Sequence, residues 1–323
     1  MLTLRKIVVL ILSQAIIIYC IFPFFGASSL VLRCNAENNK IYQNLAVEIP
    51  QKLDFAGEAV PLERLDIRES LDRELLINTY WQSQTSLFFK RANRIFPVIE
   101  PILKKNDIPD DFKYLALIES GFANVVSPSG ATGFWQFIQS TAEKNGLIVN
   151  DEVDERYHLE KSTEAACKYL KNSYSIFKSW TLAAAAYNMG DIGLGNTIKT
   201  QKVNNYYDLL FNAETARYVF RILAVKTIFE NPKKYGFNFE DSDLYPIVKT
   251  ESVVVDSTVT DLAQFALDKG INYKILKEYN PWLRKPSLIN KGKNIFYIKI
   301  PFPDELLYKK HFPDKGSNYN DNK

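Results

Sequence analysis

The sequence of 323 residues predicts a mainly α-helical protein that ends in a small α+β domain. Between residues 86 and 236, apolar side chains return at the spacing of amphipathic helices. After residue 250, two short runs rich in β-branched and aromatic residues enclose two helical patterns. These observations predict a helical domain followed by a small βααβ domain.

The helices can be placed from their apolar spacing and their end signals. Pro97 and Pro101 should kink or divide the second helix, because proline lacks the backbone donor of a helix interior. Ser140 is expected to cap a later helix, with Glu143 completing a capping box. In the helical domain and the segment before it, the predicted helices cover residues 70–81, 88–102, 110–120, 140–146, 162–177, 180–188 and 215–229. The βααβ pattern has strands at 253–255 and 295–301, and the helices between them cover 260–269 and 273–279.

The domain borders are expected where the composition changes. The parts are a signal peptide or membrane anchor at 1–33, an N-terminal linker with the first helix at 34–85, the helical domain at 86–236, a linker at 237–250, the βααβ domain at 251–302 and a polar tail at 303–323.

The first part is a targeting signal. Arg5 and Lys6 precede a mostly apolar run from Ile7 to Phe25. This run is long for a signal core and short for a membrane span, so a cleaved leader and an uncleaved anchor both stay open. A lipoprotein cleavage site requires a small residue before its cysteine. Neither Cys20 nor Cys34 follows such a residue. The sequence therefore predicts export.

Composition excludes several classes of function. Forty basic residues are offset by thirty-seven acidic ones without a basic block, so no nucleic-acid partner is predicted. His158 and His311 are far apart and the three cysteines are scattered, so neither a metal site nor a cofactor is predicted. Cys167 is expected to be a buried thiol, and nothing in the spacing argues for its pairing with Cys34.

One acid interrupts the apolar face of the predicted helix 110–120. Phe112, Leu115 and Phe122 lie on the same helix line as Glu119. Desolvation raises the pKa of a carboxyl group, which lets it keep a proton near neutral pH and deliver it to a leaving oxygen. A glutamate at the edge of an apolar stripe can equally reach solvent or pair with a base.

A glycine-rich loop follows this acid. Gly121 should end the helix, and the turn residues 127–130 should fold the chain back across the helix end. Gly133 could let a backbone amide approach a ligand closely, Trp135 offers a flat apolar surface, and Gln136 offers a donor and an acceptor. This mixture suits a sugar, although Trp135 could as well belong to the core.

An ordered set of motifs runs through about half of the chain. The first three are Glu119-Ser120-Gly121-Phe122, then Ser127-Pro128-Ser129-Gly130-Ala131-Thr132-Gly133-Phe134-Trp135-Gln136, then Ala185-Ala186-Tyr187-Asn188; Asp154-Glu155-Arg156, Ser162-Thr163-Glu164-Ala165-Ala166 and Glu214-Thr215-Ala216-Arg217-Tyr218-Val219 keep the same family order. Together they resemble the signatures of the soluble-lytic-transglycosylase domain of glycoside hydrolase family 23.

The resemblance implies a lysozyme-like helical fold and cleavage of peptidoglycan glycan strands. One glutamate, here Glu119, would protonate the oxygen of the β-1,4 bond between N-acetylmuramic acid and N-acetylglucosamine. The same group would then act as base while the muramic 6-hydroxyl attacks its own anomeric carbon, giving a 1,6-anhydro product. The implied location is the bacterial cell envelope, in the periplasm or anchored to the membrane and facing it.

The resemblance also implies roles around this acid. The Tyr187 hydroxyl would point toward the acid and the sugar N-acetyl group, and Asn188 would shape the same wall. Ser127 and Gln136 would hydrogen-bond the substrate or the acid, and Glu214 would line the cleft. By residue type alone, Tyr187 could be a core residue, Asn188 could end a helix, and Glu214 could complement a helix dipole.

Two other functions remain open on the sequence. Ordinary glycosidases use two carboxylates. Capping explains Asp110 and Asp111, but one acid of the cluster at 151–155 could be a second carboxylate, which would make the chain a lysozyme-type muramidase with reducing-end products. The other alternative is a non-catalytic peptidoglycan-binding scaffold, although such a protein does not need a proton donor in its cleft.

The βααβ region resembles a LysM sugar-binding module. The resemblance lies in Asn280-Pro281 after the second helix and in Lys291-Gly292-Lys293 before the last strand. The usual Gly-Asp-Thr after the first strand is replaced by Asp256-Ser257-Thr258. Glycan binding and a purely structural or docking role therefore both stay open.

Overall fold

The computed structural model describes residues 46–313. The helices and strands described all belong to the unit Val47–Lys323. The predicted signal peptide or anchor at 1–33, Cys20, Cys34 and the last part of the polar tail lie outside the described residues. Within residues 46–313, no helix combines the length and the apolar content that a membrane crossing requires.

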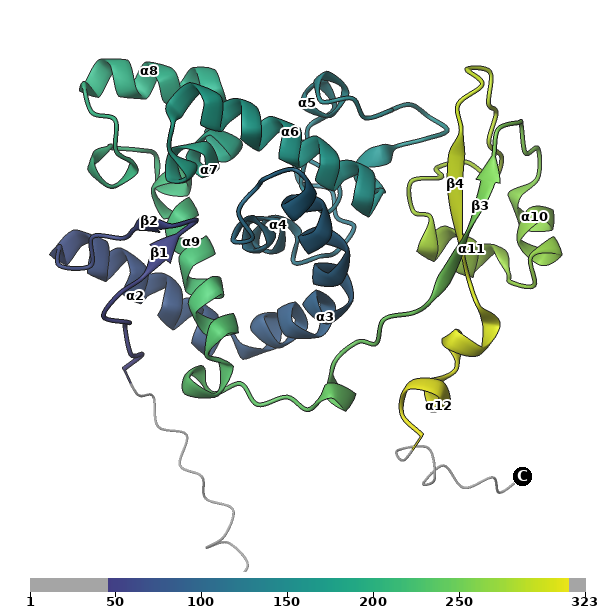
Figure 1. Ribbon diagram of the computed structural model, residues 1–323, viewed down its shortest axis with the longest axis horizontal. Helices are drawn as coiled ribbons and strands as arrows, with labels where there is room; N and C mark the ends of the chain where they lie inside the picture. The colour runs from purple at the N-terminus through teal and green to yellow at the C-terminus, as the bar shows by residue number, and fades with distance from the viewer. Residues whose placement is uncertain (1–45, 314–323) are drawn as a thin grey trace, which may run out of the picture. The chain divides into compact units, whose positions relative to one another are not determined.

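The fold is mainly α with a small α+β domain at its C-terminal end, as the sequence predicts (Figure 1). The first domain holds a hairpin of β1 (Asp54–Phe55) and β2 (Glu58–Ala59) and then helices only. These are α2 (Leu65–Tyr80), α3 (Gln82–Lys105), α4 (Phe112–Ser120), α5 (Gln139–Lys144), α6 (Leu159–Phe177), α7 (Trp180–Met189), α8 (Asp191–Gln201) and α9 (Ala213–Glu230), with short 3-10 turns at Glu155–Tyr157, Tyr206–Asp208, Pro232–Tyr235 and Asp241–Asp243.

The helix α4 lies in the interior of this domain, where it packs on α3 and α9 (Figure 1). Phe112, Leu115 and Phe122 are buried, as the predicted apolar line requires. The alanines 183–186 of α7 are fully buried as well, and such small side chains let α6 and α9 approach α7 closely. The thiol of Cys167 is also buried, as expected.

The structure differs from the sequence prediction at three helices. First, α3 runs unbroken through Pro97 and Pro101, because both prolines face solvent and the carbonyls that lose a partner can bind water. Second, α5 begins at Gln139 after an extended Ile138, so Ser140 lies inside the helix and does not cap it. Third, the sequence does not predict α8. This helix contains two glycines and only one buried residue, Leu194, so its apolar residues do not repeat with a clear helical spacing.

Asp111 is the N-cap residue of α4, but its side chain does not cap the helix, which corrects the sequence prediction. Its side chain accepts no hydrogen bond from the first turn of α4. Instead, Asp111 Oδ2 accepts hydrogen bonds from the backbone amide of Ala56 and from Lys226 Nζ, both at 2.7 Å. The side chains of Lys226 and Asp111 are 7% and 16% exposed. This buried ion pair links the β1–β2 hairpin, α4 and α9. The neighbouring Asp110, which precedes α4, forms an ion pair with Lys113 in the first turn of the helix.

The C-terminal domain is built on the antiparallel pair β3 (Thr250–Val255) and β4 (Phe296–Pro301), in which Val253 is opposite Ile298. Between the strands lie α10 (Leu262–Asp268) and α11 (Tyr273–Tyr279), so the predicted βααβ order is present. The 3-10 turn Pro303–Leu306 and α12 (Tyr308–His311) follow, at the start of the segment that the sequence predicts as a polar tail. The apolar core of the C-terminal domain is centred on Leu262, Leu276 and Ile298.

The buried pair predicts a large loss of stability on substitution. Lys226→Met would leave the Asp111 carboxylate without its cation, so we expect the free energy of unfolding in urea to fall by about 3 kcal/mol or more. Lys274→Met is the control, because Lys274 is 79% exposed and forms its ion pair with Glu278 in the next turn of the helix. It should change the free energy by less than about 0.5 kcal/mol. Equal effects of the two variants would contradict the structural role of the buried pair.

Candidate active site

Glu119 lies in the last turn of α4, half-buried between α4 and α9. The hydroxyl of Tyr218, on α9, donates a hydrogen bond to Glu119 Oε1. Burial raises the pKa of Glu119, and the charge of Glu214 acts in the same direction. The Tyr218 hydrogen bond and the charge of Arg221 act against this shift without cancelling it. The acid is therefore held in its protonated form to a higher pH than an exposed glutamate.

The end of α4 that carries this acid is fixed by its backbone. Gly121 takes a left-handed conformation with φ of 57°, and its amide donates to the Leu117 carbonyl. Two guanidinium groups bind the terminal carbonyls: Arg221 donates to Ile118 O and Arg91 donates to Gly121 O, both at 2.9 Å. These carbonyls have no partner within the helix, so the arginines satisfy them and hold the last turn in place.

The glycine-rich loop 127–137 folds back onto this helix end. Ser120 Oγ donates to Phe134 O at 2.8 Å, one residue from the acid. Trp135 is fully buried and its indole nitrogen donates to Thr163 Oγ1 at 2.9 Å. Of the two interpretations of Trp135, the core residue is therefore the one that the structure supports. Its ring anchors the loop and does not offer a face to a sugar.

The loop glycines serve the fold of the loop. The Gly130 amide donates to Ser127 O and the Gly133 amide to Val125 O, so both amides are used internally. Gly133 has φ of 81°, and a Cβ atom there would lie 2.0 Å from the carbonyl oxygen of Arg156. Glycine is thus required at 133 by a close approach of the protein's own backbone and not by a ligand.

Gln136 and Ser127 occupy different parts of this loop. Gln136 has φ of 49°, a left-handed conformation that is rare outside glycine, and its side-chain nitrogen donates to Val125 O and Gly133 O. Within residues 46–313 its Oε1 has no hydrogen-bond donor. Ser127 Oγ instead accepts from the Ala131 amide and lies 2.9 Å from Ser129 Oγ. Ser127 therefore shapes the turn and is engaged there.

Tyr187 and Asn188 end the alanine-rich helix α7 next to the acid. The Tyr187 hydroxyl donates to Trp135 O at 2.8 Å, and burial together with the charge of Glu119 raises the Tyr187 pKa well above its usual value. Asn188 Nδ2 donates to Glu214 Oε1 at 3.0 Å, while its Oδ1 accepts from Thr215. Glu214 is exposed in the first turn of α9, which Asn212 caps, so it complements the helix dipole and also acts on Glu119.

Residues 96–210, which contain this site up to Asn188, match the transglycosylase SLT domain. Residues 251–304 match the soluble lytic transglycosylase C-terminal LysM-like domain. This chain contains a transglycosylase SLT domain. The family resemblance seen in the motifs is confirmed, and the βααβ domain is the LysM-like domain.

Two relatives are similar to the chain outside these limits as well. Both carry the name membrane-bound lytic murein transglycosylase D, one from Escherichia coli strain K12 and one from Escherichia coli O6:H1. Each is 30% identical to this chain over 259 residues, which cover 76% of the chain and 55% of the relative. The chain thus spans about half the length of the curated relatives that it matches.

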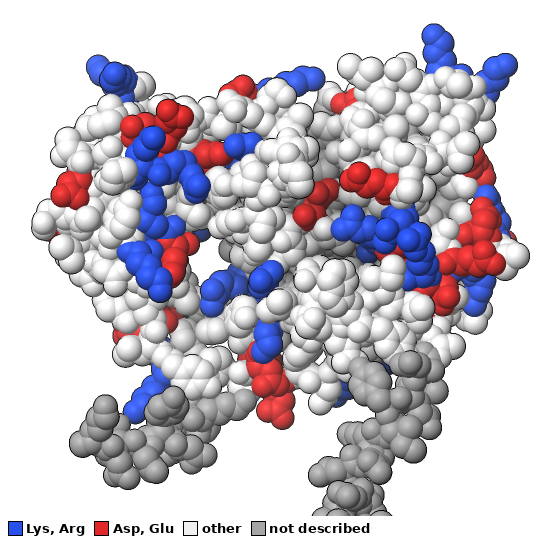
Figure 2. Space-filling model, turned by 180° about the vertical axis from the view of Figure 1, so that it is seen from behind, with Lys and Arg blue, Asp and Glu red and all other residues white. Residues whose placement is uncertain are grey.

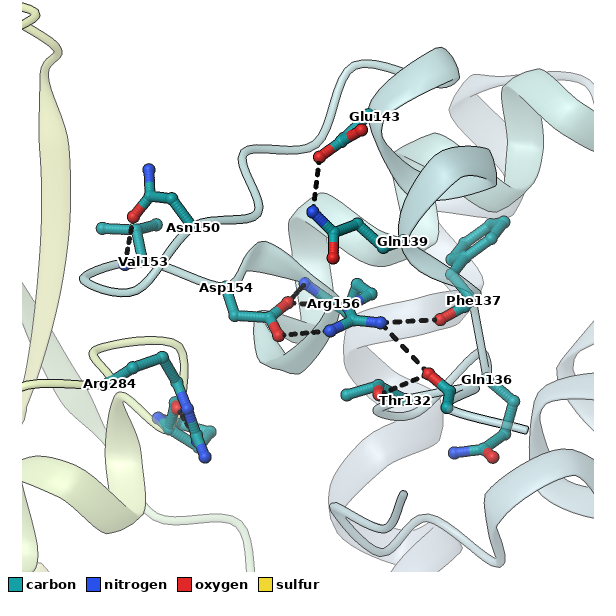
Figure 3. Close-up of polar contacts among 12 residues, drawn as sticks. Thr132, Gln136, Phe137, Gln139, Glu143, Asn150, Val153, Asp154, Arg156 and Arg284 are labelled. Atoms are coloured by element: carbon teal, nitrogen blue, oxygen red, sulfur yellow. Dashed lines mark hydrogen bonds and ion pairs between the residues drawn. The ribbon is translucent and has the colours of Figure 1, made fainter. Parts of the chain in front are cut away.

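Two acids of the cluster 151–155 of the SLT domain, Asp154 and Glu155, are buried and have structural roles. Asp154 forms a two-pronged ion pair with Arg156, at 2.9 Å to Nε and 2.7 Å to Nη2 (Figure 3). Glu155 accepts a hydrogen bond from the Ile148 amide at 2.8 Å. The acid whose charge raises the Glu119 pKa is Glu214. Among the acids that the structure describes, Glu214 is therefore the better candidate for a second carboxylate.

Tyr218 and Arg221 of α9, which act on Glu119 together with Glu214, are not singled out by the sequence. Tyr218 belongs to the motif at 214–219, in which the family resemblance singles out only Glu214 as a site residue. A signal was present, since Tyr218 lies four residues after Glu214 and Arg221 three residues later, which places all three on one helix face. Within residues 46–313, no three His, Cys, Asp or Glu side chains gather as metal ligands would.

Because the pKa of Glu119 is raised, we expect the folded protein to become less stable as pH rises above the acidic range. The folded protein holds this proton more tightly than the unfolded chain, so stability is lost as pH rises from about 4.3 through the raised folded pKa. Glu119→Gln removes this loss. We expect the variant to match the parent near pH 4 and, at pH 8, to exceed it in urea unfolding by more than about 0.5 kcal/mol. The exposed Glu69→Gln is the control, and a difference for Glu119→Gln that stays constant with pH would contradict the burial argument.

Proposed function

We propose that this chain is a lytic transglycosylase that cleaves the β-1,4 bond between N-acetylmuramic acid and N-acetylglucosamine in peptidoglycan. The observation that supports it most is the half-buried Glu119 at the fixed end of α4, whose pKa burial raises and whose Oε1 accepts a hydrogen bond from Tyr218. Membership of the SLT family and similarity to two murein transglycosylases support the substrate class. The SLT domain at 86–236 and the LysM-like domain at 251–302 would form one enzyme.

The reaction needs one protein acid if the substrate supplies the nucleophile. Glu119 gives its proton to the glycosidic oxygen, and the bond from that oxygen to the anomeric carbon of muramic acid breaks. The Glu119 carboxylate then takes the proton of the muramic 6-hydroxyl as this oxygen bonds to the same anomeric carbon. A 1,6-anhydro ring forms and the acid regains its proton, so no water is consumed and no metal or cofactor is needed.

The remaining site residues have proposed roles in binding. Gln136 would accept from the sugar through Oε1, because its nitrogen is committed to the loop. Tyr187 and Asn188 would form the wall of the cleft, with Asn188 holding Glu214 in place. Tyr218 tunes the acid. Ser127 would act on the substrate through the shape of the turn, since its hydroxyl is bound there.

A second candidate is supported by Glu214. If this carboxylate activates a water molecule, the enzyme is a lysozyme-type muramidase with reducing-end products. The cellular site proposed for either enzyme is the bacterial envelope on the peptidoglycan side, with the segment 1–33 as leader or anchor. On the face shown in Figure 2, basic and acidic side chains are interspersed.

Glu119→Gln should abolish turnover. Glutamine keeps the shape and can accept the Tyr218 hydrogen bond, but it cannot deliver a proton. We expect the release of soluble fragments from purified sacculi to fall by a factor of about 10² to 10⁴, while binding to sacculi survives. Glu69→Gln should be fully active. Unchanged turnover by Glu119→Gln would remove the mechanism, and mass spectrometry separates anhydro products from reducing products, which are heavier by one water.

Tyr218→Phe should shift the pH profile of kcat. Its hydroxyl stabilises the charged form of Glu119, so removing it raises the Glu119 pKa further. The acid then stays protonated to higher pH, and the alkaline limb of kcat should move upward. Tyr206→Phe is the matched control, because Tyr206 is buried beside the same helix but donates to the carbonyls of Thr215 and Ala216. A downward shift in Tyr218→Phe, or equal shifts in both variants, would contradict this role.

A further inference from the structure

The LysM-like domain shares its core with a loop of the SLT domain. Val153 and Tyr157 belong to the apolar cluster that contains Leu276 and Ile298. The backbone joins them as well: the Asp154 amide donates to Trp282 O at 2.9 Å, and the Arg284 amide donates to Glu152 O at 2.8 Å. Segment 148–157 is therefore packed as part of both domains.

Side chains reinforce this contact. The guanidinium of Arg284 lies 4.2 Å above the ring of Tyr157, which is a cation–π contact at close range. Lys299 of β4 forms an ion pair with Glu160 of α6. Burial acts to raise the Glu160 pKa, but His158 and Lys299 lower it to about 2. Glu160 is thus charged throughout the pH range of the proposed activity, and this ion pair persists.

The same segment holds the active-site loop through Arg156. Asp154 fixes the guanidinium with two hydrogen bonds, and Arg156 Nη1 then donates to Gly130 O at 3.2 Å and to Phe137 O at 3.3 Å (Figure 3). Only 11% of the Arg156 side chain and 10% of the Asp154 side chain are exposed. One arginine thus closes both ends of the loop that carries Gln136.

The backbone makes a second connection at the same place. The carbonyl of Arg156 occupies the space beside Gly133 where any side chain would stand. From Gly133 the loop continues to Phe134, whose carbonyl binds Ser120 beside Glu119. A displacement of Arg156 therefore reaches the acid's own helix through two short steps.

We propose that Arg156 is a positioning residue for loop 130–137 and that the LysM-like domain keeps Arg156 in place by packing on segment 148–157. The LysM-like domain is then a structural part of the catalytic unit. It is not a separate glycan-binding module on a linker. Arg156 does not touch the reacting atoms; it acts through the loop carbonyls and the Ser120 contact. The kinetic consequence of this inference rests on the proposed function, while its structural consequence does not.

Hydrogen exchange of the full chain tests the arginine. Arg156→Gln removes the charge-assisted bonds to the loop, so amides in 130–137 should exchange about tenfold faster or more, which corresponds to about 1.4 kcal/mol of lost protection. Arg64→Gln is the matched control, because Arg64 also forms a two-pronged pair with an aspartate two residues away, Asp66, but makes no contact with the loop. Loop exchange unchanged in Arg156→Gln would overturn the proposal.

Substitutions at the contact between the two domains test the role of the LysM-like domain. Val153→Asp places a charge in the shared core, and the milder Arg284→Ala removes the contact with Tyr157 and a hydrogen bond to Pro281 O within the LysM-like domain. Both should accelerate exchange in 130–137, and adding Arg156→Gln should give little further effect, because one connection has already been broken. If both variants exchange faster only within the LysM-like domain and loop 130–137 stays protected, the link between the domains is wrong.

Kinetics supplies a readout that a merely structural role would not change. A looser loop admits water to the acid, so the Glu119 pKa should fall toward its ordinary value and the alkaline limb of kcat should move to lower pH in Arg156→Gln. Arg156→Lys should restore part of kcat, since a cation remains. If Arg156→Gln lowers kcat but leaves the alkaline limb of kcat at the same pH as in the parent protein, the positioning role is overturned. If Glu119→Gln itself proves active, the proposed function fails, and the exchange data still decide this inference.

Discussion

The environment of the Glu119 carboxyl is the constraint on which the arrangement of the SLT domain depends. A carboxyl group in water loses its proton near pH 4, and here burial at the end of α4 raises that pKa, while Tyr218 and Arg221 limit the rise. Such a balance holds only if distances stay fixed. The left-handed Gly121, the two arginines on the terminal carbonyls and the Ser120 bond to the loop all fix the last turn of the helix.

Several polar features that could be taken for ligand sites support this geometry instead. The loop glycines do not expose their amides, and Trp135 and Asp154 are bound inside the protein. Buried polar groups must be paired, so a loop that crosses the end of a buried helix needs many internal hydrogen bonds. Among the residues that the structure describes, Gln136 Oε1 is left without a donor, and the Glu119 carboxyl is bound by the Tyr218 hydroxyl.

Stability and function oppose each other at this site. A carboxyl that is costly to ionise destabilises the folded state above acidic pH, and the left-handed Gln136 adds backbone strain. The buried pair of Lys226 with Asp111, far from the acid along α4, stabilises the start of the same helix. The LysM-like domain adds a further contact through Val153 and Tyr157, so the loop and the two domains are held by one continuous set of interactions.

The sequence by itself determined the fold class, the apolar line on α4, the alanine-rich α7, the βααβ order and the family, because these depend on local periodicity and on motifs. It also indicated Glu119, since an acid on an apolar line is a local pattern. Only the tertiary structure decided that Tyr218 and Arg221 tune this acid, that Trp135 is core and that Asp111 pairs with Lys226. It also decided that Arg156 binds the loop and that segment 148–157 packs on the LysM-like domain. These contacts join residues distant in sequence, and a carboxylate or an arginine has many partners of equal chemistry until folding brings one of them within hydrogen-bond distance.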